Sequence, residues 1–430
     1  MSQKKENIRL DSRPLKVAFI CHSDNLGGAS VVTRRLVQAL NAQGVDARLI
    51  VFNKISDDAS VQAVTQSRLR RGYPFMMERL GIAMANGFSR ENLFKVSTAS
   101  HGVDLSDHPD VRSADVIVLS WINQGLLSLQ GIRRLGRLGK PIVWAMHDMW
   151  NLTGICHHSI GCEGYTDRCG RCRFLTGTKD EDLSRRTWEK KKMLYDEVPI
   201  TFVAVSNWLA ECGRRSSLLS GRDLRVIPNA FPVDSFSTTP GLELSRIPSD
   251  TRVILMGAAR LDDPIKGLGM AVDALNYIFD NDPEVARDTT AVFFGGMNDP
   301  RGLEDLRFPH LRFGMINDGR IVRELYARAS VVISSSVYET LPGTLIEGQA
   351  AGALPVSFDH GGQRDIIDHK KNGYLAEFGD IRDFAEGIKW ALANPADRNW
   401  LREQVRERFA SDVIARRYID LFEELLGRQK

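Results

Sequence analysis

The sequence lacks the features of several protein classes. Its 430 residues carry a formal net charge of only +3, with seven Trp and eight Tyr, which is too little basic and aromatic patterning for nucleic-acid binding. No stretch reaches the roughly 18 apolar residues of a membrane span. The first apolar run, Val17 to Cys21, is too short for the core of a signal peptide. We therefore expect a cytoplasmic globular protein that does not bind nucleic acid.

Cysteine is also scarce, yet four of the six cysteines lie between positions 156 and 172. In a reducing compartment such a cluster favours a metal over disulfides. The loop is rich in glycine and poor in apolar residues, so a structural zinc ion would supply folding energy. Two alternatives stay open, four reduced structural thiols or two disulfides. The candidate zinc ligands are Cys156, Cys162, Cys169 and Cys172, the last two in a Cys-x-x-Cys knuckle, with His157 or His158 as a replacement for one of them.

The composition, 43% apolar and 26% charged, is ordinary for a globular protein, and the length suggests two or three domains. Two series of strand-like runs alternate with helical patterns, one opening at Lys16 to Cys21 and the other at Arg252 to Ala258. A glycine turn, Gly27-Gly28, precedes the first amphipathic helix. Two successive series of this kind predict an α/β protein with two doubly wound, Rossmann-like domains that face each other.

The join between the two series is predicted near Arg225 to Asp234, where two prolines precede a polar stretch. We expect a first domain over residues 14–228, with a cysteine-rich insert at 154–174. A second domain is expected over residues 229–411, followed by an amphipathic helix at 412–430.

The most informative pattern is a pair of acids, Glu339 and Glu347, that follow the apolar run Ala329 to Ile333 across a Gly/Pro turn. The pattern predicts strand, loop and helix, with Glu339 at the mouth of the loop and Glu347 about one turn into the helix. Gly343 lies where the N–H groups of a helix N-terminus can face an anion. This arrangement suits a nucleotide sugar, with one acid for sugar hydroxyls and one for ribose hydroxyls. The alternative is two solvated acids near a helix start.

Two cations, Arg260 and Lys266, lie between the first strand of the second series and its helix. Loops at the carboxyl ends of parallel strands bind ligands in α/β sheets. Fixed cations there would neutralise a diphosphate leaving group without reorganisation. The alternative is two solvated surface cations. No Asp-x-Asp motif lies at a clear strand end, so no cofactor or metal is expected to be required for catalysis.

These motifs together resemble the family 4 retaining glycosyltransferases, which have the GT-B fold. The resemblance rests on the two glutamates followed by Ala350 to Val356, and on the spacing from Arg260 to Lys266. It implies that both cations contact the donor phosphates and that the last helix crosses back onto the first domain. The donor-binding residues that it implies are Arg260, Lys266, Gly343, Thr344, Leu345, Glu347, Gly27 and Gly28.

The resemblance also implies that His147 and Asp148, which follow another strand-like run, lie on the acceptor side of the cleft. A lone histidine is more often structural, but in the family this histidine reaches the transferred sugar, and we do not assign it as a base. The implied catalytic residues are Glu339, His147, Arg260 and Lys266. The His-Asp-Met-Trp sequence with a cysteine-rich loop resembles a branch from exopolysaccharide gene clusters, whereas Glu347 to Gln349 departs from the usual Glu-Ala-Met.

A basic and apolar segment between Arg68 and Arg90 has two interpretations. It includes Arg68, Arg70, Arg71 and Arg79 among apolar residues. A helix of this composition can lie on an anionic membrane, or it can be a domain helix that packs its apolar face into the core.

The expected function is retaining transfer of a hexose-type sugar from a nucleotide-diphosphate donor to a glycan or lipid-linked acceptor, in cell-surface polysaccharide synthesis. Peripheral contact with the inner face of the cell membrane would fit such an acceptor. One alternative is a GT-B sugar-nucleotide epimerase, which would need acids and bases in the cleft beyond His147. Another is a catalytically silent nucleotide-sugar-binding partner of a polysaccharide assembly complex.

Overall fold

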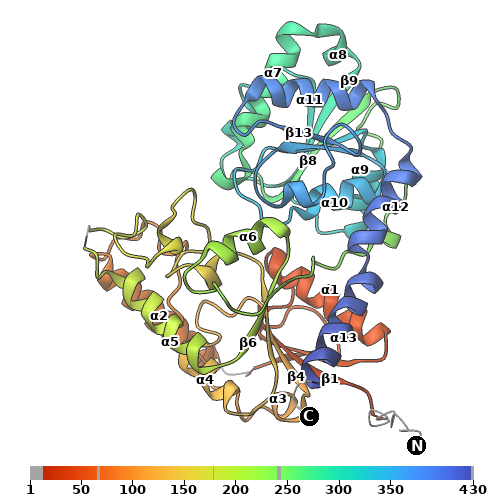
Figure 1. Ribbon diagram of the computed structural model, residues 1–430. Coiled ribbons are helices and arrows are strands. Elements are labelled where there is room, and N and C mark those ends of the chain that lie inside the picture. Colours follow the sequence, from red (N-terminus) through yellow and green to blue (C-terminus); the bar gives the residue numbers. More distant parts are fainter. Residues whose placement is uncertain (1–12, 65–67, 178, 240–243, 428–430) are drawn as a thin grey trace, which may run out of the picture.

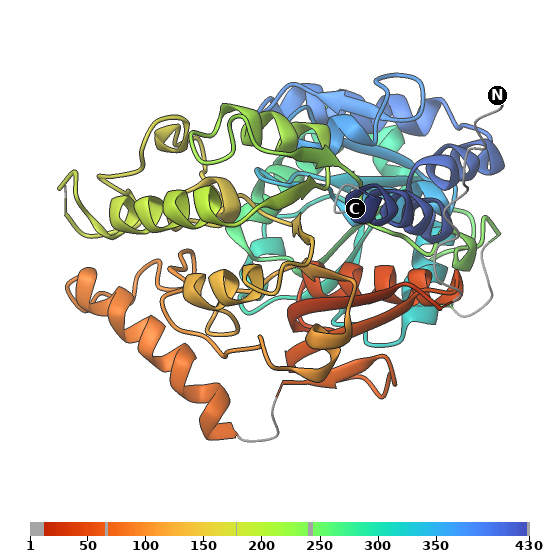
Figure 2. The same cartoon turned by 60° about the horizontal axis from the view of Figure 1, so that its bottom comes forward.

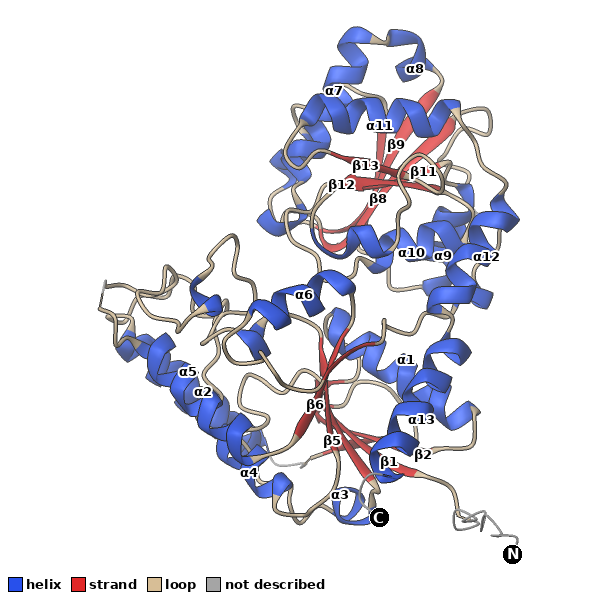
Figure 3. Cartoon of the chain, in the orientation of Figure 1, coloured by secondary structure: helices blue, strands red, loops and turns tan. Residues whose placement is uncertain are grey.

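The chain folds into two α/β domains, each built on a parallel sheet (Figure 1). The computed structural model describes residues 13–64, 68–177, 179–239 and 244–427. In Figure 1 the first domain lies below and the second above, and Figure 3 shows helices around the sheet of each. The two doubly wound domains predicted from the sequence are confirmed.

The first sheet has the strand order β3-β2-β1-β4-β5-β6-β7. Its central strands are buried almost throughout because helices cover both faces, as is usual for parallel sheets. The order reverses between β1 and β4, which creates a switch point at their carboxyl ends. The strands are β1 (Lys16–Ser23), β2 (Asp46–Asn53), β3 (Val61–Ala63), β4 (Val116–Leu119), β5 (Ile142–Met146), β6 (Ile200–Ala204) and β7 (Leu224–Val226).

The helices of this domain follow its strands in the alternation that the sequence predicts. A long segment between β5 and α5 contains the predicted cysteine-rich insert and only short 3-10 turns, η1 (Trp150–Leu152) and η2 (Gly164–Thr166). The helices are α1 (Gly28–Ala42), α2 (Arg68–Ala85), α3 (Pro109–Ser113), α4 (Leu129–Gly136), α5 (Leu183–Glu197) and α6 (Asn207–Arg215).

The second sheet has the order β10-β9-β8-β11-β12-β13, so its switch point lies between β8 and β11. The loop after β8 carries Lys266, and the loop after β11 carries Glu339. The strands are β8 (Arg252–Arg260), β9 (Thr289–Gly296), β10 (His310–Gly314), β11 (Val331–Ser334), β12 (Leu354–Phe358) and β13 (Tyr374–Ala376).

The helices of the second half cover its sheet and then return to the first domain. They are α7 (Leu268–Asn281), α8 (Pro283–Arg287), α9 (Gly319–Arg328), α10 (Gly343–Ala350), α11 (Ile381–Ala393), α12 (Arg398–Phe409) and α13 (Ser411–Gly427).

The final helix, α13, packs against α1 of the first domain (Figure 1). Tyr418 and Phe422 share one buried cluster with Phe19 and Val37, and the Gln43 side chain donates to the Asp412 carbonyl oxygen at 2.7 Å. The crossing implied by the family resemblance is therefore present, while residues 428–430 lie outside the described part of the chain. Within that part, no helix combines the length and apolar character needed to cross a membrane.

Candidate functional site

A cavity of about 640 Å³ lies between the two domains. This volume is within the usual range for small-molecule sites. It opens beside the carboxyl ends of β1, β5, β8 and β11, close to the switch points of both sheets. The predicted site residues that line it are Gly27, Gly28, His147, Asp148, Lys266, Glu339, Gly343, Thr344 and Glu347.

Two of the predicted donor-binding residues, Arg260 and Leu345, do not line this cavity. Strand β8 continues through Arg260, which pairs with Gly296 of β9, whereas the sequence predicted that the strand ends at Ala258. Arg260 is therefore a strand residue rather than a loop residue. Its guanidinium is half exposed and lies 3.5 Å from Asp262 and 3.4 Å from Asp263. A donor contact would require the side chain to leave these two acids.

Leu345, the second of these residues, is fully buried inside the first turn of α10. Its backbone N–H donates to the Pro342 carbonyl oxygen at 3.2 Å, so this donor is already used. The structure therefore leaves Gly343 and Thr344 as the residues of this turn that reach the cavity.

Lys266 and Glu339 form an ion pair at the floor of the cleft, with 2.6 Å between Nζ and Oε1. Lys266 ends the short 3-10 helix η4 (Pro264–Lys266), and Gly267 follows with φ of 65°. A Cβ atom on Gly267 would lie only 2.1 Å from the Ser335 carbonyl oxygen. Glycine is thus required for the loop after β8 to pack on the loop after β11, and this packing brings the cation to the carboxylate.

The N-terminus of α10 opens into the cavity beside this ion pair. Its N-cap is Pro342, and no side chain caps the helix. The first N–H groups of a helix have no partner within the helix and carry partial positive charge. With Lys266 close by, Gly343 and Thr344 therefore present a site suited to an anion such as a phosphate.

Glu347 lies about one turn further along α10, at the contact between the domains. Its Oε1 is 3.2 Å from the guanidinium of Arg35, which comes from α1 of the first domain. The Tyr326 hydroxyl also hydrogen-bonds to Glu347. Arg35 in turn lies over the ring of Phe231, 5.6 Å from its centroid. Sequence reasoning missed Arg35, because only the docking of the two domains brings it here.

His147 lines the first-domain wall of the cavity. Its Nε2 is 2.7 Å from the Ser120 hydroxyl oxygen, and its buried Nδ1 has no hydrogen-bond partner among the described residues. Burial lowers the pKa of this imidazole to about 4, although the charge of Asp148 acts in the opposite direction. His147 is thus neutral near pH 7, and its Nδ1 is buried without a partner among the described residues.

Asp148 has the opposite character, since its carboxylate is fully occupied by the protein. It accepts hydrogen bonds from the Trp121 indole at 2.9 Å and the Trp150 backbone at 2.8 Å, and it lies 2.7 Å from His157 Nδ1. Burial opposes ionisation, but the charge and hydrogen bond of His157 lower the pKa of Asp148 to about 2. This carboxylate positions its neighbours.

His157 and His158, the two alternative zinc ligands, contact other residues instead. His157 is bound to Asp148 through Nδ1, and its Nε2 is 3.1 Å from the Ser97 hydroxyl oxygen. His158 lines the cleft, with its ring centroid 4.7 Å from that of Tyr338. Neither ring is directed to the cysteine loop, and His158 is a cleft residue that the sequence did not identify.

The domains also contact each other directly around the cleft. The Thr340 hydroxyl donates to the His147 carbonyl oxygen at 2.9 Å, and the Tyr338 hydroxyl contacts the Met149 sulfur. Both second-domain residues belong to the loop that carries Glu339. Movement of that loop would therefore be transmitted to the histidine on the opposite wall.

Gly28 provides a test of how closely a ligand approaches the first domain. A Cβ on Gly28 would meet no protein atom within 4 Å, and its φ is not in the left-handed region. We expect Gly28→Ala to keep the wild-type melting temperature but to lower turnover about 10- to 100-fold, because the methyl group displaces the ligand. Gly269→Ala, in the first turn of α7 and also in open space, is the matched control. Unchanged kinetics in both variants would contradict close approach at Gly28.

The low pKa of His147 predicts a pH dependence of stability. The folded protein keeps this imidazole neutral down to about pH 4, whereas the unfolded chain binds a proton below about 6.5. Its contribution is therefore complete above pH 6.5 and is lost as the pH falls toward 4. Asp148 stays ionised across this window. In urea titrations between pH 7 and 5, His147→Gln should lose less stability than wild type, and equal losses would show that the folded histidine titrates normally.

Comparison with known proteins identifies the fold and the family. The chain superposes on Anabaena Alr3699/HepE with a TM-score of 0.60 at 16% identity, over 95% of this chain and all of that one. The predicted GT-B fold is confirmed. The profile of Glycosyltransferase Family 4 matches residues 26–235, and that of Glycosyl transferases group 1 matches residues 265–408. The two glycosyltransferase profiles together cover most of the chain, one in each domain.

Two curated relatives each match about half of the chain. The phosphatidyl-myo-inositol mannosyltransferase of Mycobacterium tuberculosis is 29% identical over 213 residues, which is 46% of this chain and 51% of that protein. The exopolysaccharide phosphotransferase SCO2592 of Streptomyces coelicolor is 28% identical over 215 residues, 48% of this chain and 21% of that protein. The chain thus spans about half or less of the length of these relatives.

Proposed function

We propose that the protein transfers a hexose-type sugar from a nucleoside-diphosphate donor to a glycan or lipid-linked acceptor, with retention of configuration. The observation that carries the proposal is the Lys266–Glu339 ion pair beside the uncapped N-terminus of α10, in a cleft between two sheets. The pair provides a cation for phosphate and a carboxylate for sugar hydroxyls within one small region.

The geometry suggests a place for each part of the donor. The diphosphate would lie between Lys266 and the N–H groups of Gly343 and Thr344, where developing charge on the leaving group is stabilised. The ribose would lie deeper along α10, near Glu347. The transferred sugar would then lie between Glu339 and His147, which both line the cavity. The Anabaena protein of the same fold was solved with UDP and glucose, which supports uridine nucleotides as the first donors to test.

Retention is supported by the protonation states of the first-domain wall. An inverting transfer needs a general base at the acceptor hydroxyl. His147 is neutral with a pKa of about 4, which makes it a weak base, and Asp148 is occupied by three donors. These two groups therefore bind and orient the substrates in our proposal, and neither is assigned to remove the acceptor proton.

The acceptor class is supported by the relatives and by the site. One relative is named as a phosphatidyl-myo-inositol mannosyltransferase and another as an exopolysaccharide phosphotransferase. Both names fit a glycan or lipid-linked acceptor in cell-surface polysaccharide synthesis, the branch expected from the sequence. The epimerase alternative would need further acid–base groups in the cleft, and a silent partner would not need the intact Lys266–Glu339 pair.

The proposal is tested by a donor screen with product analysis. Purified protein is incubated with uridine, guanosine and adenosine diphosphate sugars, each with and without a membrane extract as the source of acceptors. We expect one donor to release nucleoside diphosphate in an acceptor-dependent reaction, with an α-linked product from an α-linked donor by NMR. An epimerised donor without transfer would support the epimerase. Tight nucleotide-sugar binding without turnover under any condition would support the silent partner.

A lipid-linked acceptor is further supported by the surface of α2, which is apolar where a domain helix is normally polar. Tyr73, Met76, Leu80 and Met84 recur every three or four residues along α2 and are between 42% and 59% exposed. In Figure 2 this orange helix lies along the outer edge of the first domain. The spacing places these side chains on one face, which we call the α2 apolar face.

The opposite side of α2 is held on the domain by polar contacts. The Glu78 carboxylate is fully buried and accepts from the Thr98 and Ala99 backbone N–H groups, each at 2.8 Å. Arg79 is also buried and donates to the Val96 carbonyl oxygen at 3.1 Å. The one acid of this helix is therefore turned inward.

The charge around the α2 apolar face favours an anionic bilayer as its occupant. Arg90 and Lys95 are exposed in the segment that follows α2, which also carries one exposed acid, Glu91. The side chains of Arg68, Arg70 and Arg71 lie outside the described part of the chain. We propose peripheral contact of this face with anionic lipid, where apolar burial and attraction to the headgroups add together.

Vesicle sedimentation tests the contact. We expect the protein to sediment with vesicles of phosphatidylcholine and phosphatidylglycerol, less with phosphatidylcholine alone, and less at high salt. A triple variant, Met76→Gln, Leu80→Gln and Met84→Gln, should lose this binding, while Met193→Gln with Met315→Gln, also exposed, should keep it. Equal binding by both variants would overturn the proposal, as would a solution dimer that the triple variant abolishes.

A further inference from the structure

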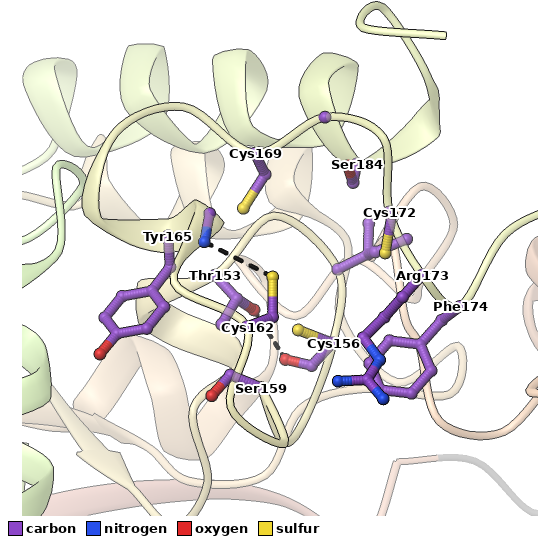
Figure 4. A pocket seen from close by; sticks show the side chains of 13 residues that line it. Thr153, Cys156, Ser159, Cys162, Tyr165, Cys169, Cys172, Arg173, Phe174 and Ser184 are labelled. Carbon is purple, nitrogen blue, oxygen red and sulfur yellow. Dashed lines mark hydrogen bonds between the residues drawn. The ribbon is translucent and has the colours of Figure 1, made fainter. Parts of the chain in front are cut away.

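Four cysteine side chains line one small cavity in the loop between η1 and α5. All four are free, and in Figure 4 their sulfur atoms turn toward the space that the loop encloses. The cavity has a volume of about 20 Å³, which is room for roughly one water-sized particle. The residues are Cys156, Cys162, Cys169 and Cys172.

Backbone donors already face these sulfur atoms. The Gly154 N–H donates to Cys169 Sγ at 3.1 Å, and the Gly164 N–H lies 3.5 Å from Cys162 Sγ. The Phe174 backbone hydrogen-bonds to Cys172 in the same way, two residues after the cysteine. Backbone N–H groups directed at sulfur are the kind of outer-shell contact that orients the ligands of a metal ion.

The buried Lys191 lies beside the same group, and burial lowers the pKa of its side chain well below the usual value. Lys191 is fully buried, and its Nζ donates to the Trp150 carbonyl oxygen at 2.6 Å and to the Thr153 carbonyl oxygen at 3.1 Å. Cys169 and Cys156 are within its electrostatic reach. Within the described part of the chain, no carboxylate forms an ion pair with Lys191. A divalent ion held by four thiolates carries net negative charge, which would compensate this lysine.

The loop has little regular secondary structure, although side chains such as Asp182 and Arg185 hydrogen-bond to its backbone. Between Thr153 and Asp182 its regular structure, as far as described, is the single turn η2. Ile160 and Arg171 adopt left-handed φ values of 46° and 47°, which are costly for residues other than glycine. The apolar cluster under the loop comprises five buried residues, Ile82, Val96, Ile155, Cys156 and Phe174. A metal would supply the missing stability.

We propose that the four cysteines bind one Zn²⁺ in a closed, tetrahedral, structural site. As described, no three His, Cys, Asp or Glu side chains are yet arranged to hold an ion. Binding must therefore draw the sulfur atoms inward to about 2.3 Å from the metal. Side-chain rotation around a cavity of this size can provide that closure.

The zinc site would affect the cleft by fixing the position of neighbouring residues, and the metal would take no part in catalysis. Cys156 directly precedes His157, which is bound to Asp148, and His158, which lines the cleft. Fixing Cys156 therefore fixes the peptide that carries both rings. Loss of the metal should loosen the acceptor side while the nucleotide side, built on the second domain, stays intact.

The test begins with metal content and does not depend on activity. Protein purified without chelator should contain about one zinc per chain, and cobalt substitution should give the visible absorption bands of a tetrahedral thiolate site. Cys169→Ser with Cys172→Ser should lose the metal, lower the melting temperature and expose residues 153–182 to proteolysis. Cys21→Ser with Cys212→Ser, which changes two cysteines that do not line this cavity, should keep the zinc.

Three results would overturn the proposal. The first is disulfide-linked peptides from this loop in protein kept under reducing conditions. The second is four free thiols with no bound metal and a melting temperature that added Zn²⁺ does not raise. The third is full zinc content in the Cys169/Cys172 variant. Because wild-type protein answers the first two, the test stands even if that variant fails to fold.

Discussion

Lys266→Ala is expected to lower turnover at least ~100-fold, the scale for loss of one preorganised charge-stabilising group. Lys266 lines the cleft 2.6 Å from Glu339, beside the open end of α10. In our proposal it stabilises the charge that develops on the diphosphate as the sugar leaves. The measurement is nucleoside diphosphate release under saturating donor, with the melting temperature as a check of folding.

Arg260→Ala and Lys371→Ala complete this experiment. The family resemblance predicts the same loss for Arg260 as for Lys266, whereas the geometry places Arg260 outside the cavity against two acids. We therefore expect the loss in Arg260→Ala to be smaller unless the donor draws the side chain inward. Lys371, an exposed lysine of the same domain, should be neutral. Near-normal turnover in both Arg260→Ala and Lys266→Ala would refute the phosphate assignment.

The local part of the site could be predicted because each piece is contained in a short segment. The glutamate pair, the glycine turn and the His-Asp sequence each follow a buried strand, and a parallel sheet gathers the ends of such strands at one edge. The buried runs at β1 and β8 were sufficient to indicate two domains. The resemblance supplied the crossing of α13.

The remaining parts depend on contacts between residues that are far apart in the sequence. Arg35 reaches Glu347 across 312 residues, and His158 meets Tyr338 only because the domains face each other. No periodicity in either segment carries this information. The apolar residues of α2 were ambiguous for a related reason, since the pattern shows an apolar face but not whether the domain covers it. Arg260 was misplaced because pairing with β9 extends β8 beyond its apolar run.

Glu339→Gln is expected to lower turnover by at least ~100-fold while changing nucleoside diphosphate affinity little. Glu339 holds Lys266 and faces the region proposed for the transferred sugar. The amide keeps the size of the side chain but removes its charge. Rate and binding are separated by single-turnover kinetics and by calorimetry with the nucleoside diphosphate.

Glu347→Gln is the matched comparison, because the same change is made in α10, the helix that follows the loop carrying Glu339. Its carboxylate is held by Arg35 and Tyr326 in the region proposed for the ribose. A neutral amide would accept ribose hydroxyl hydrogen bonds less strongly, since bonds to a charged acceptor are the stronger ones. We therefore expect weaker nucleoside diphosphate binding in Glu347→Gln. Equal loss of nucleotide affinity in both variants would contradict this division of roles, because the two acids would then contact the same part of the donor.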